Sequence, residues 1–157
     1  MKLDLHIHTK ASDGSFDVLH IINKARKKNL EAIAITDHDT MDSVKEILDT
    51  GLHFNDIKVF YGIEFSSKVK GFGKAHILGF FSRDIRNVIK KIDMFTGPYK
   101  KARITRAKKI IKKLNGLKIK ITYDEVLSYA GGQVIARPNI AEVLVKKGYA
   151  KNFGEAF

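Results

Sequence analysis

The residue types best suited to chemistry stand at the start of the chain, where two histidines occur two positions apart. His6 and His8 lie in Asp4-Leu5-His6-Ile7-His8-Thr9, where apolar and polar residues alternate as in a half-buried strand. Both rings then point to the same side of the sheet, with Cα atoms about 6.6 Å apart. They can converge on one metal ion or on two adjacent ions, and the Ser-Asp-Gly turn that follows can bring Asp13 to the same place. The alternative is a surface strand with two solvated histidines.

A second strand, predicted over 32–39, ends in Thr-Asp-His and supplies His38. The segment between the two strands is predicted to be a helix over 16–28 with Ser15 as its N-cap. A strand–helix–strand unit implies a right-handed crossover and a parallel strand pair. Sites form at the carboxyl ends of parallel strands, so we expect His38 beside His6 and His8.

The third predicted strand, 59–66, carries the carboxylate of Glu64 among apolar residues. Burying an unpaired carboxylate costs several kcal/mol, so a cation or an ion pair is expected beside it. A turn-like stretch separates this strand from the next apolar segment, which contains His76. A hairpin centred on Lys70 makes Glu64 and His76 direct cross-strand neighbours, with Cβ atoms about 5 Å apart. An exposed Glu–His pair is the alternative.

These patterns place a set of imidazoles and carboxylates at one end of one sheet. The chain has no cysteine, which excludes disulfides and thiolate metal sites. A sulfur-free set of this kind favours Mn, Fe or Zn over Ca or Mg, and more than four ligands indicate two or three divalent ions with Glu64 suited to bridging two. Such clusters serve phosphoester hydrolysis. The predicted metal ligands are His6, His8, Asp13, His38, Glu64 and His76.

Five segments in this order resemble successive motifs of the PHP (polymerase and histidinol phosphatase) superfamily, above all its phosphoesterases acting on nucleotides and short RNA. The segments are Asp4-Leu5-His6-Ile7-His8-Thr9, Ser12-Asp13-Gly14, Ile35-Thr36-Asp37-His38-Asp39-Thr40, Gly62-Ile63-Glu64 and His76-Ile77-Leu78-Gly79. The resemblance implies an α/β fold, a distorted (β/α)7 barrel. It also implies one ion at His6, His8 and Glu64, a second at Glu64 and His76, and a third at Asp13 and His38.

The function implied by the resemblance is a metal-dependent phosphoesterase acting on nucleotides or short oligonucleotides, of the nucleotide phosphatase or 5'-3' exoribonuclease type. Asp13, His38 and Glu64 are the expected catalytic residues, and Asp37 and Asp39 support the histidines. Substrate contacts are expected from Arg103, Arg106 and Arg137. The alternatives are a histidinol-phosphate-type phosphatase, a PHP module of a DNA polymerase, and an inactive PHP scaffold that binds nucleic acid.

Members of this branch are longer and complete the cluster with a later histidine and an Asp-x-His. This chain has no histidine after His76, and it stops just after Asn152-Phe153-Gly154-Glu155, which has the pattern of a helix start. We therefore expect the chain to be a fragment of a longer protein, with the N-terminal half of the barrel and weak metal binding. Phosphoester hydrolysis by the 157 residues alone is expected to be slow or absent.

The charge divides the chain near residue 81. Residues 1–81 carry 11 basic and 11 acidic residues, whereas residues 82–157 carry 18 basic and 6 acidic residues and account for the whole net charge of +12. We expect 1–81 to form the half-barrel with the metal site and 82–157 to form a basic helical insertion. Helices are predicted over 84–96, over 98–115 after a break at Gly97-Pro98, from Thr122 to a stop at Gly131-Gly132, and over 137–147.

The lysine-rich helix over 98–115 has two interpretations. It is either a solvated face or an electrostatic guide for polyanions, because 14 basic and 2 acidic residues fall between Ser82 and Ile121. No aromatic ladder interleaves the basic residues, which favours small nucleotides and short oligonucleotides over extended stacked strands. The sequence has no apolar run that would span a membrane and no feature pointing to a stable protein partner, and the lack of cysteine fits a reducing cytoplasm.

Overall fold

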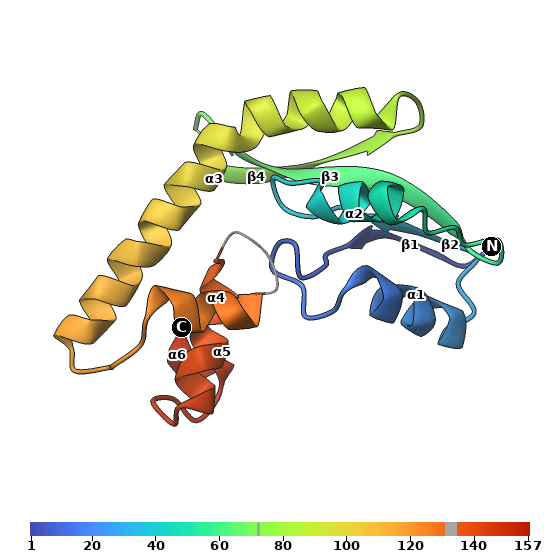
Figure 1. The fold of residues 1–157 in the computed structure, drawn as a ribbon. Helices are drawn as coiled ribbons and strands as arrows, with labels where there is room; N and C mark the ends of the chain where they lie inside the picture. The colour runs from blue at the N-terminus through green and yellow to red at the C-terminus, as the bar shows by residue number, and fades with distance from the viewer. Residues whose placement is uncertain (72, 131–134) are drawn as a thin grey trace. The chain divides into compact units, whose positions relative to one another are not determined.

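Helices and strands alternate along the first half of the chain, and helices alone follow. The computed structural model describes residues 1–71, 73–130 and 135–157, and Figure 1 shows its elements. The predicted α/β class is confirmed. The elements are β1 (Leu3–Ile7), α1 (Val18–Lys27), β2 (Ala32–Ile35), α2 (Asp42–Thr50), β3 (Lys58–Val69), β4 (Gly73–Phe81), α3 (Ile85–Gly116), α4 (Tyr123–Ala130), α5 (Arg137–Lys146) and α6 (Phe153–Ala156).

The four strands form one sheet in the order β1-β2-β3-β4. β1, β2 and β3 are parallel, and α1 and α2 make the two crossovers between them. The crossover through α1 is the one that the strand–helix–strand pattern predicted. β4 returns antiparallel to β3 through a hairpin. The carboxyl ends of the three parallel strands therefore meet at one edge of the sheet, which is where a site is expected.

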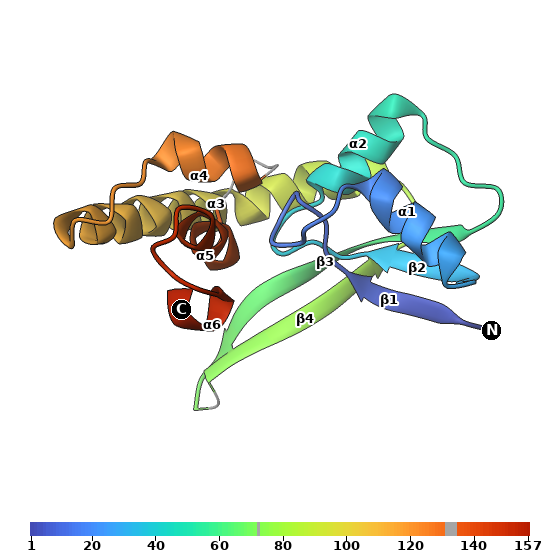
Figure 2. The same cartoon turned by 90° about the horizontal axis from the view of Figure 1, so that it is seen from below.

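The core of this sheet lies on the face that α1 and α2 cover. Val18, Ile22 and Ala25 form the buried stripe of α1, and Ile33 and Ile35 of β2 are fully buried against the helices. Figure 2 shows α1 and α2 on the same side of the sheet. The apolar periodicity of the sequence thus orients both helices and leaves the other face of the sheet to the side chains of the site.

The β3–β4 hairpin turns one residue later than the sequence predicted. Val69 pairs with Gly73, so the turn is centred on Gly71 and not on Lys70. Gly71 has a φ of +86°, a left-handed conformation that a lysine adopts only with strain. The prediction that Glu64 and His76 are directly opposite is therefore wrong, because Glu64 pairs with Leu78 and His76 pairs with Ser66. The two residues are diagonal neighbours, still within reach of long side chains.

The start of α1 also differs from the prediction. Asp17, and not Ser15, is the N-cap, and its carboxylate accepts a hydrogen bond from the backbone N–H of His20. An ionised aspartate offers a stronger acceptor than serine at this position, so the helix begins two residues later than expected.

The chain forms two compact units, Met1–Gly97 and Pro98–Phe157, and the long helix α3 passes from one to the other. The predicted break at Gly97-Pro98 is wrong as a helix end, because α3 continues through it. Proline clashes with the Cβ of the residue before it, and Gly97 has none, which reduces the cost of keeping Pro98 in the helix. Within the described residues, no helix combines the length and hydrophobicity needed to cross a membrane.

The second unit has its own apolar core, built from α3, α4 and α5. Ala107 and Ile111 of α3 pack there with Val126 of α4 and Val143 of α5. The predicted helix start at Thr122 is confirmed as a capping box, since Thr122 and Glu125 exchange side chain to backbone hydrogen bonds. The predicted stop of that helix at Gly131-Gly132 lies outside the described residues.

Gly62 allows β3 and β4 to approach closely beside the site. A Cβ at Gly62 would lie 2.7 Å from the carbonyl oxygen of Gly79 and 2.9 Å from Cγ2 of Thr36. We therefore expect Gly62→Ala to push the strands apart and to lower the free energy of unfolding by about 1–3 kcal/mol. Thermal unfolding followed by circular dichroism measures the change.

Gly79→Ala in the same hairpin is the matched control. A Cβ at Gly79 would make only ordinary contacts of 3.5–3.7 Å, so we expect a change below about 1 kcal/mol. Equal destabilisation by both substitutions would contradict the close-packing role of Gly62.

Candidate metal centre

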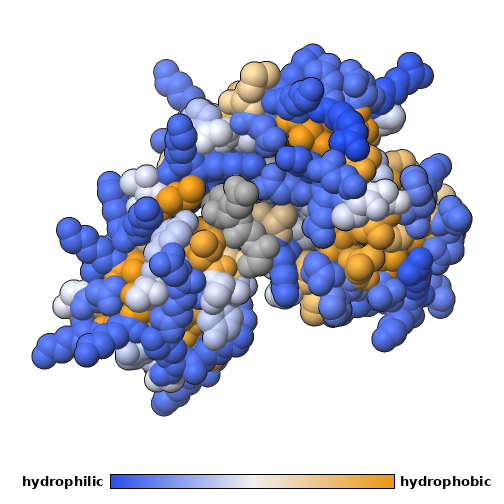
Figure 3. All heavy atoms as spheres, in the orientation of Figure 1, coloured by the Kyte–Doolittle hydropathy of each residue, from blue (hydrophilic) through white to orange (hydrophobic). Residues whose placement is uncertain are grey.

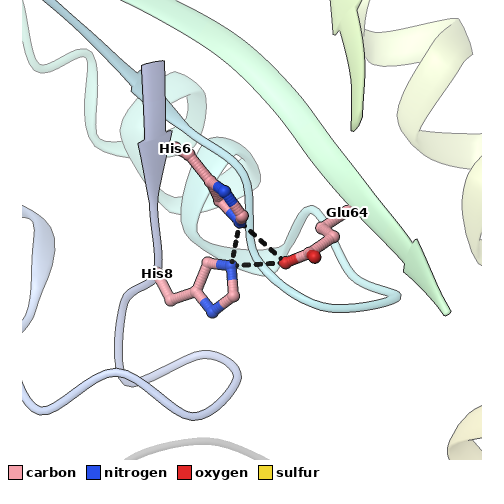
Figure 4. A group of neighbouring side chains, drawn as sticks. All are labelled: His6, His8 and Glu64. Atoms are coloured by element: carbon pink, nitrogen blue, oxygen red, sulfur yellow. Dashed lines mark hydrogen bonds and ion pairs between the residues drawn. The ribbon is translucent and has the colours of Figure 1, made fainter. Parts of the chain in front are cut away.

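Glu64 is the centre of a cluster of imidazoles at the carboxyl end of the parallel strands. Its side chain is only 3% exposed. Oε2 lies 2.9 Å from Nε2 of His6 and 2.7 Å from Nε2 of His8, as Figure 4 shows. Oε1 lies 2.7 Å from Nδ1 of His76, and Nδ1 of His38 is 3.4 Å from Oε2. Four histidine rings thus surround one buried carboxylate.

The strand ends place these side chains. The N–H of Thr36 donates to the carbonyl of Ile7, which continues the pairing of β2 with β1 to the residue before His8. His38 forms a single parallel bridge with Glu64. In this bridge the backbone N–H of Glu64 donates to the backbone carbonyl of Asp37, and the backbone N–H of Asp39 donates to the backbone carbonyl of Glu64. Backbone hydrogen bonds therefore join the ends of all three parallel strands at the site. This agrees with the expectation that the carboxyl ends of these strands meet at one edge of the sheet.

β1 carries an irregularity that the sequence did not reveal. Its register against β2 shifts between Asp4 and Ile7, the stretch that contains His6. Bulges of this kind re-aim side chains beside functional sites. Nε2 of His6 and Nε2 of His8 nevertheless lie only 3.1 Å apart, so both rings reach the same place.

Asp13 joins the cluster from the turn after β1. Its Oδ1 lies 2.7 Å from Nδ1 of His8, and its Oδ2 lies 3.7 Å from Nε2 of His38. The turn folds tightly onto the strand end, because the N–H of Gly14 donates to the carbonyl of Thr9 at 2.9 Å. A Cβ at Gly14 would overlap the carbonyl of His8, so only glycine allows this approach.

The six predicted ligands form three overlapping groups of three residues. Within each group, the candidate ligand atoms lie within 4.8 Å of one another. The groups are His6, His8 and Glu64; His8, Asp13 and His38; and His38, Glu64 and His76. Two nitrogens that each lie about 2.0–2.1 Å from a tetrahedral zinc ion are about 3.3 Å apart, close to the 3.1 Å between His6 and His8. The donor types and spacing fit divalent ions that accept imidazole and carboxylate.

The surroundings of Glu64 and His8 shift the pKa values of both side chains toward their charged forms. Burial raises the pKa of Glu64, but hydrogen bonds from His6 and His76 and the charges of His38 and His8 outweigh it, so the pKa lies below its usual value. Burial lowers the pKa of His8, but the hydrogen bond to Asp13 and the nearby carboxylate charges raise it above its usual value. Both shifts favour the charged forms, a Glu64 carboxylate beside a protonated His8.

Asp37 is a second buried carboxylate, and it ties the segments of the site together. It accepts hydrogen bonds from the N–H of Thr9 at 2.7 Å, the hydroxyl of Thr9 at 2.8 Å and the hydroxyl of Ser12 at 2.6 Å. The hydroxyl of Ser43 at the start of α2 is a fourth donor. Thr9, Ser12 and Ser43 were not singled out from the sequence. Their hydroxyls match a buried aspartate, but no spacing rule links Ser43 to residues 9–12.

The side chain of Asp39 also forms a hydrogen bond with the backbone of a neighbouring segment. It has a φ of +54°, and its Oδ1 accepts a hydrogen bond of 2.8 Å from the N–H of Ser66 on β3. Asp37 and Asp39, predicted as supports of the histidines, thus fix the segments on either side of His38.

The other candidate residues lie elsewhere. Arg103 and Arg106 are on α3 and Arg137 begins α5, all within the second unit, so their contact with substrate stays a prediction. His20 pairs with Asp17 at the start of α1 and belongs to none of the three groups.

Asp37→Asn tests whether the hydrogen bonds of Asp37 hold the turn after β1 and the start of α2 in place. The amide keeps one acceptor oxygen but loses the charge and replaces the other oxygen with a donor. We expect about 1.5–3 kcal/mol lower stability and Mn²⁺ affinity about 10–100-fold weaker, because Asp13 and His8 lose their fixed positions. Calorimetric titration with Mn²⁺ and urea unfolding measure the two effects. Asp56→Asn, which changes an exposed carboxylate paired with Arg26, is the control and should leave Mn²⁺ affinity unchanged.

The pKa shifts predict how the stability of the metal-free protein depends on pH. The raised pKa of His8 gives stability that is complete below its ordinary value of 6.5 and is lost as the pH rises through the folded-state pKa. The lowered pKa of Glu64 gives stability that is present above its ordinary value of 4.5 and is lost as the pH falls. This pair therefore stabilises the fold most between pH 4.5 and 6.5.

Urea unfolding in EDTA from about pH 3 to about pH 9 checks this window. Asp13→Asn removes the negative charge beside His8 and weakens the hydrogen bond that raises its pKa, so the loss of stability on the alkaline side should become smaller in this variant. Identical pH profiles for the two proteins would show that Asp13 does not control His8.

Comparison with known proteins places this geometry in a family. The model of the PHP domain matches residues 4–147. A 5'-3' exoribonuclease of Haemophilus influenzae is 31% identical over 99% of this chain and 55% of its own length. The 5'-3' exoribonuclease Rnm of Escherichia coli is 30% identical over 98% of this chain and 52% of its own length. The chain thus spans about half the length of the curated relatives it matches.

The fold agrees with a solved structure. The crystal structure of a proposed metal-dependent phosphoesterase from Bifidobacterium adolescentis superposes with a TM-score of 0.77 at 26% identity, covering 99% of this chain and 54% of that one. The four-stranded sheet with its helices corresponds to part of that fold, as expected for a partial barrel followed by a helical region. The match covers nearly the whole chain and includes every predicted ligand, so this chain belongs to the PHP domain family.

Proposed function

We propose that this chain supplies the metal centre of a phosphoesterase that hydrolyses phosphate esters of nucleotides or short RNA. The observation that carries the proposal is the buried carboxylate of Glu64, with imidazole nitrogens of His6, His8 and His76 within 2.9 Å. A carboxylate in such surroundings is typical of a ligand shared between ions. The relatives named 5'-3' exoribonuclease support RNA as the substrate class.

Two or three divalent ions would be held by the six side chains. His6, His8 and Oε2 of Glu64 would hold the first, and Oε1 of Glu64 and His76 the second. Oδ2 of Asp13 and Nε2 of His38 face each other and would hold a third. Mn, Fe and Zn all accept this set of ligands.

The chain's own groups prepare the centre for this chemistry. When Nδ1–H of His8 donates to Oδ1 of Asp13, the lone pair of Nε2 points toward Glu64. The hydrogen bonds to Asp37 hold the turn that carries Asp13. Bound divalent ions supply Lewis acidity, activating water and offsetting negative charge on the phosphoryl oxygens.

Glu64→Gln tests the metal centre directly. The amide keeps the shape of the side chain but removes the charge that two groups of ligands share. We expect Mn²⁺ affinity to fall about 100-fold or more, measured by calorimetric titration and by metal analysis after dialysis. Glu31→Gln, at an exposed carboxylate beside the N-terminus, is the matched control and should bind Mn²⁺ like the unchanged protein.

Activity is tested with Mn²⁺ on a 5'-phosphorylated oligoribonucleotide, a nucleotide and histidinol phosphate, and again in EDTA. We expect release of nucleotide or phosphate from the first two substrates in a form of the protein that has the length of its relatives, and none in EDTA. Preference for histidinol phosphate would support the alternative phosphatase. Undiminished Mn²⁺ binding by Glu64→Gln would contradict the proposed centre.

A further inference from the structure

We propose that the exposed face of α3 in the second unit binds the phosphate backbone of RNA without reading its sequence. The face is formed by Lys101, Lys109, Lys112 and Lys113, here called the lysine face. This inference rests on the proposed function, because it names the part of an RNA substrate that the second unit captures. It adds a binding surface in a unit that holds none of the candidate metal ligands.

The charge of the second unit is extreme for its size. Residues 98–157 carry 14 basic and 4 acidic residues, a net charge of +10, whereas residues 1–97 carry 15 basic and 13 acidic residues. No acidic residue occurs anywhere between Gly97 and Tyr123. A field of one sign over so short a segment attracts polyanions and raises their association rate.

The packing of α3 sorts its side chains into two faces. Ala107 and Ile111 are buried, and Ile110 and Leu114 pack against the same core. At 3.6 residues per turn, the four lysines of the lysine face project from the other side of the helix, and all are exposed. In Figure 3, long hydrophilic side chains project outward along the left edge, where Figure 1 places this part of α3.

The lysine face differs from the other charged surfaces of the molecule. In the first unit Arg26 pairs with Asp56 and Arg86 pairs with Asp49. In the second unit the lysines of α5 and its C-cap pair with Glu142 and Glu125. Over residues 1–71, 73–130 and 135–157, no carboxylate pairs with a lysine of the lysine face. These cations therefore remain available to an external anion.

The geometry favours RNA over a membrane or a protein. A helix that binds a membrane surface must present its apolar stripe to the lipid, whereas the stripe of α3 is buried in the core of its own unit. The helical segment from Lys101 to Lys113 spans about 18 Å, long enough to follow several phosphates of a single strand. Lysines act as point charges on phosphate, and the face carries no aromatic side chains to stack on bases, so binding should not depend on sequence.

The test compares two variants with the same net charge. One carries Lys101→Gln, Lys109→Gln, Lys112→Gln and Lys113→Gln. The matched control carries Lys27→Gln, Lys28→Gln, Lys90→Gln and Lys91→Gln, which alters four exposed lysines of the first unit. Binding of a fluorescein-labelled oligouridylate of about 20 nucleotides is followed by fluorescence anisotropy in EDTA. Without metal the RNA is not cleaved, so the measurement is independent of catalysis.

We expect the first variant to bind the oligouridylate at least about 10-fold more weakly at low salt, and the control to bind like the unchanged protein. The slope of log K against log salt should become shallower by about 3 for four lost phosphate contacts to a single strand. An oligonucleotide of the same length and mixed sequence should give the same loss. The RNA binding is measured in EDTA and the metal centre is tested by Mn²⁺ titration, so failure of this inference is distinguished from failure of the proposed metal centre.

Three outcomes would overturn the inference. Equal weakening in both variants would mean that only net charge matters. Unchanged binding in the lysine-face variant would mean that the face is merely solvated. Binding of the unchanged protein to phosphatidylserine vesicles but not to the oligouridylate would assign the face to a membrane. Circular dichroism of both variants confirms that each is folded.

Discussion

The first unit depends on the cost of placing a carboxylate inside a strand. Glu64 has almost no contact with water, and an unpaired charge there would cost several kcal/mol. Imidazole side chains from three other segments lie beside the carboxylate and offset this cost. Small residues on the same face, Ala34, Thr36 and Gly62, leave room for those rings. The parallel crossovers bring the strand ends together where the rings are needed.

Of the buried carboxylates of the site, Glu64 and Asp37 differ most clearly in the groups that they face. Glu64 faces ring nitrogens that gain and lose protons, so its environment can change with pH or with bound ions. Asp37 faces backbone N–H and hydroxyl groups, which do not titrate in the ordinary pH range. Glu64 is therefore suited to binding either protonated histidines or metal ions. Asp37 is suited to a permanent connection between the turn after β1 and the start of α2.

Much of this arrangement was predictable from the sequence because period-2 and period-3.6 patterns are local. Alternation at His6 and His8, the apolar stripe of α1 and the Thr122–Glu125 capping box each specify an element from neighbouring residues. The hairpin register was not predictable in this way, since it depends on which residue near 70 accepts a positive φ. The shift within β1 and the hydroxyl of Ser43 at Asp37 depend on tertiary packing, which no local pattern encodes.

The division into two units also bears on how such a protein can diverge. Every candidate ligand comes from residues 6 to 76, inside the unit that ends at Gly97. The unit after Pro98 has a separate core and carries most of the net charge. Substitutions of its exposed lysines therefore change the charge of that unit without replacing any candidate ligand. The charge offered to an anion and the set of ligands around Glu64 are thus encoded in different stretches of the chain.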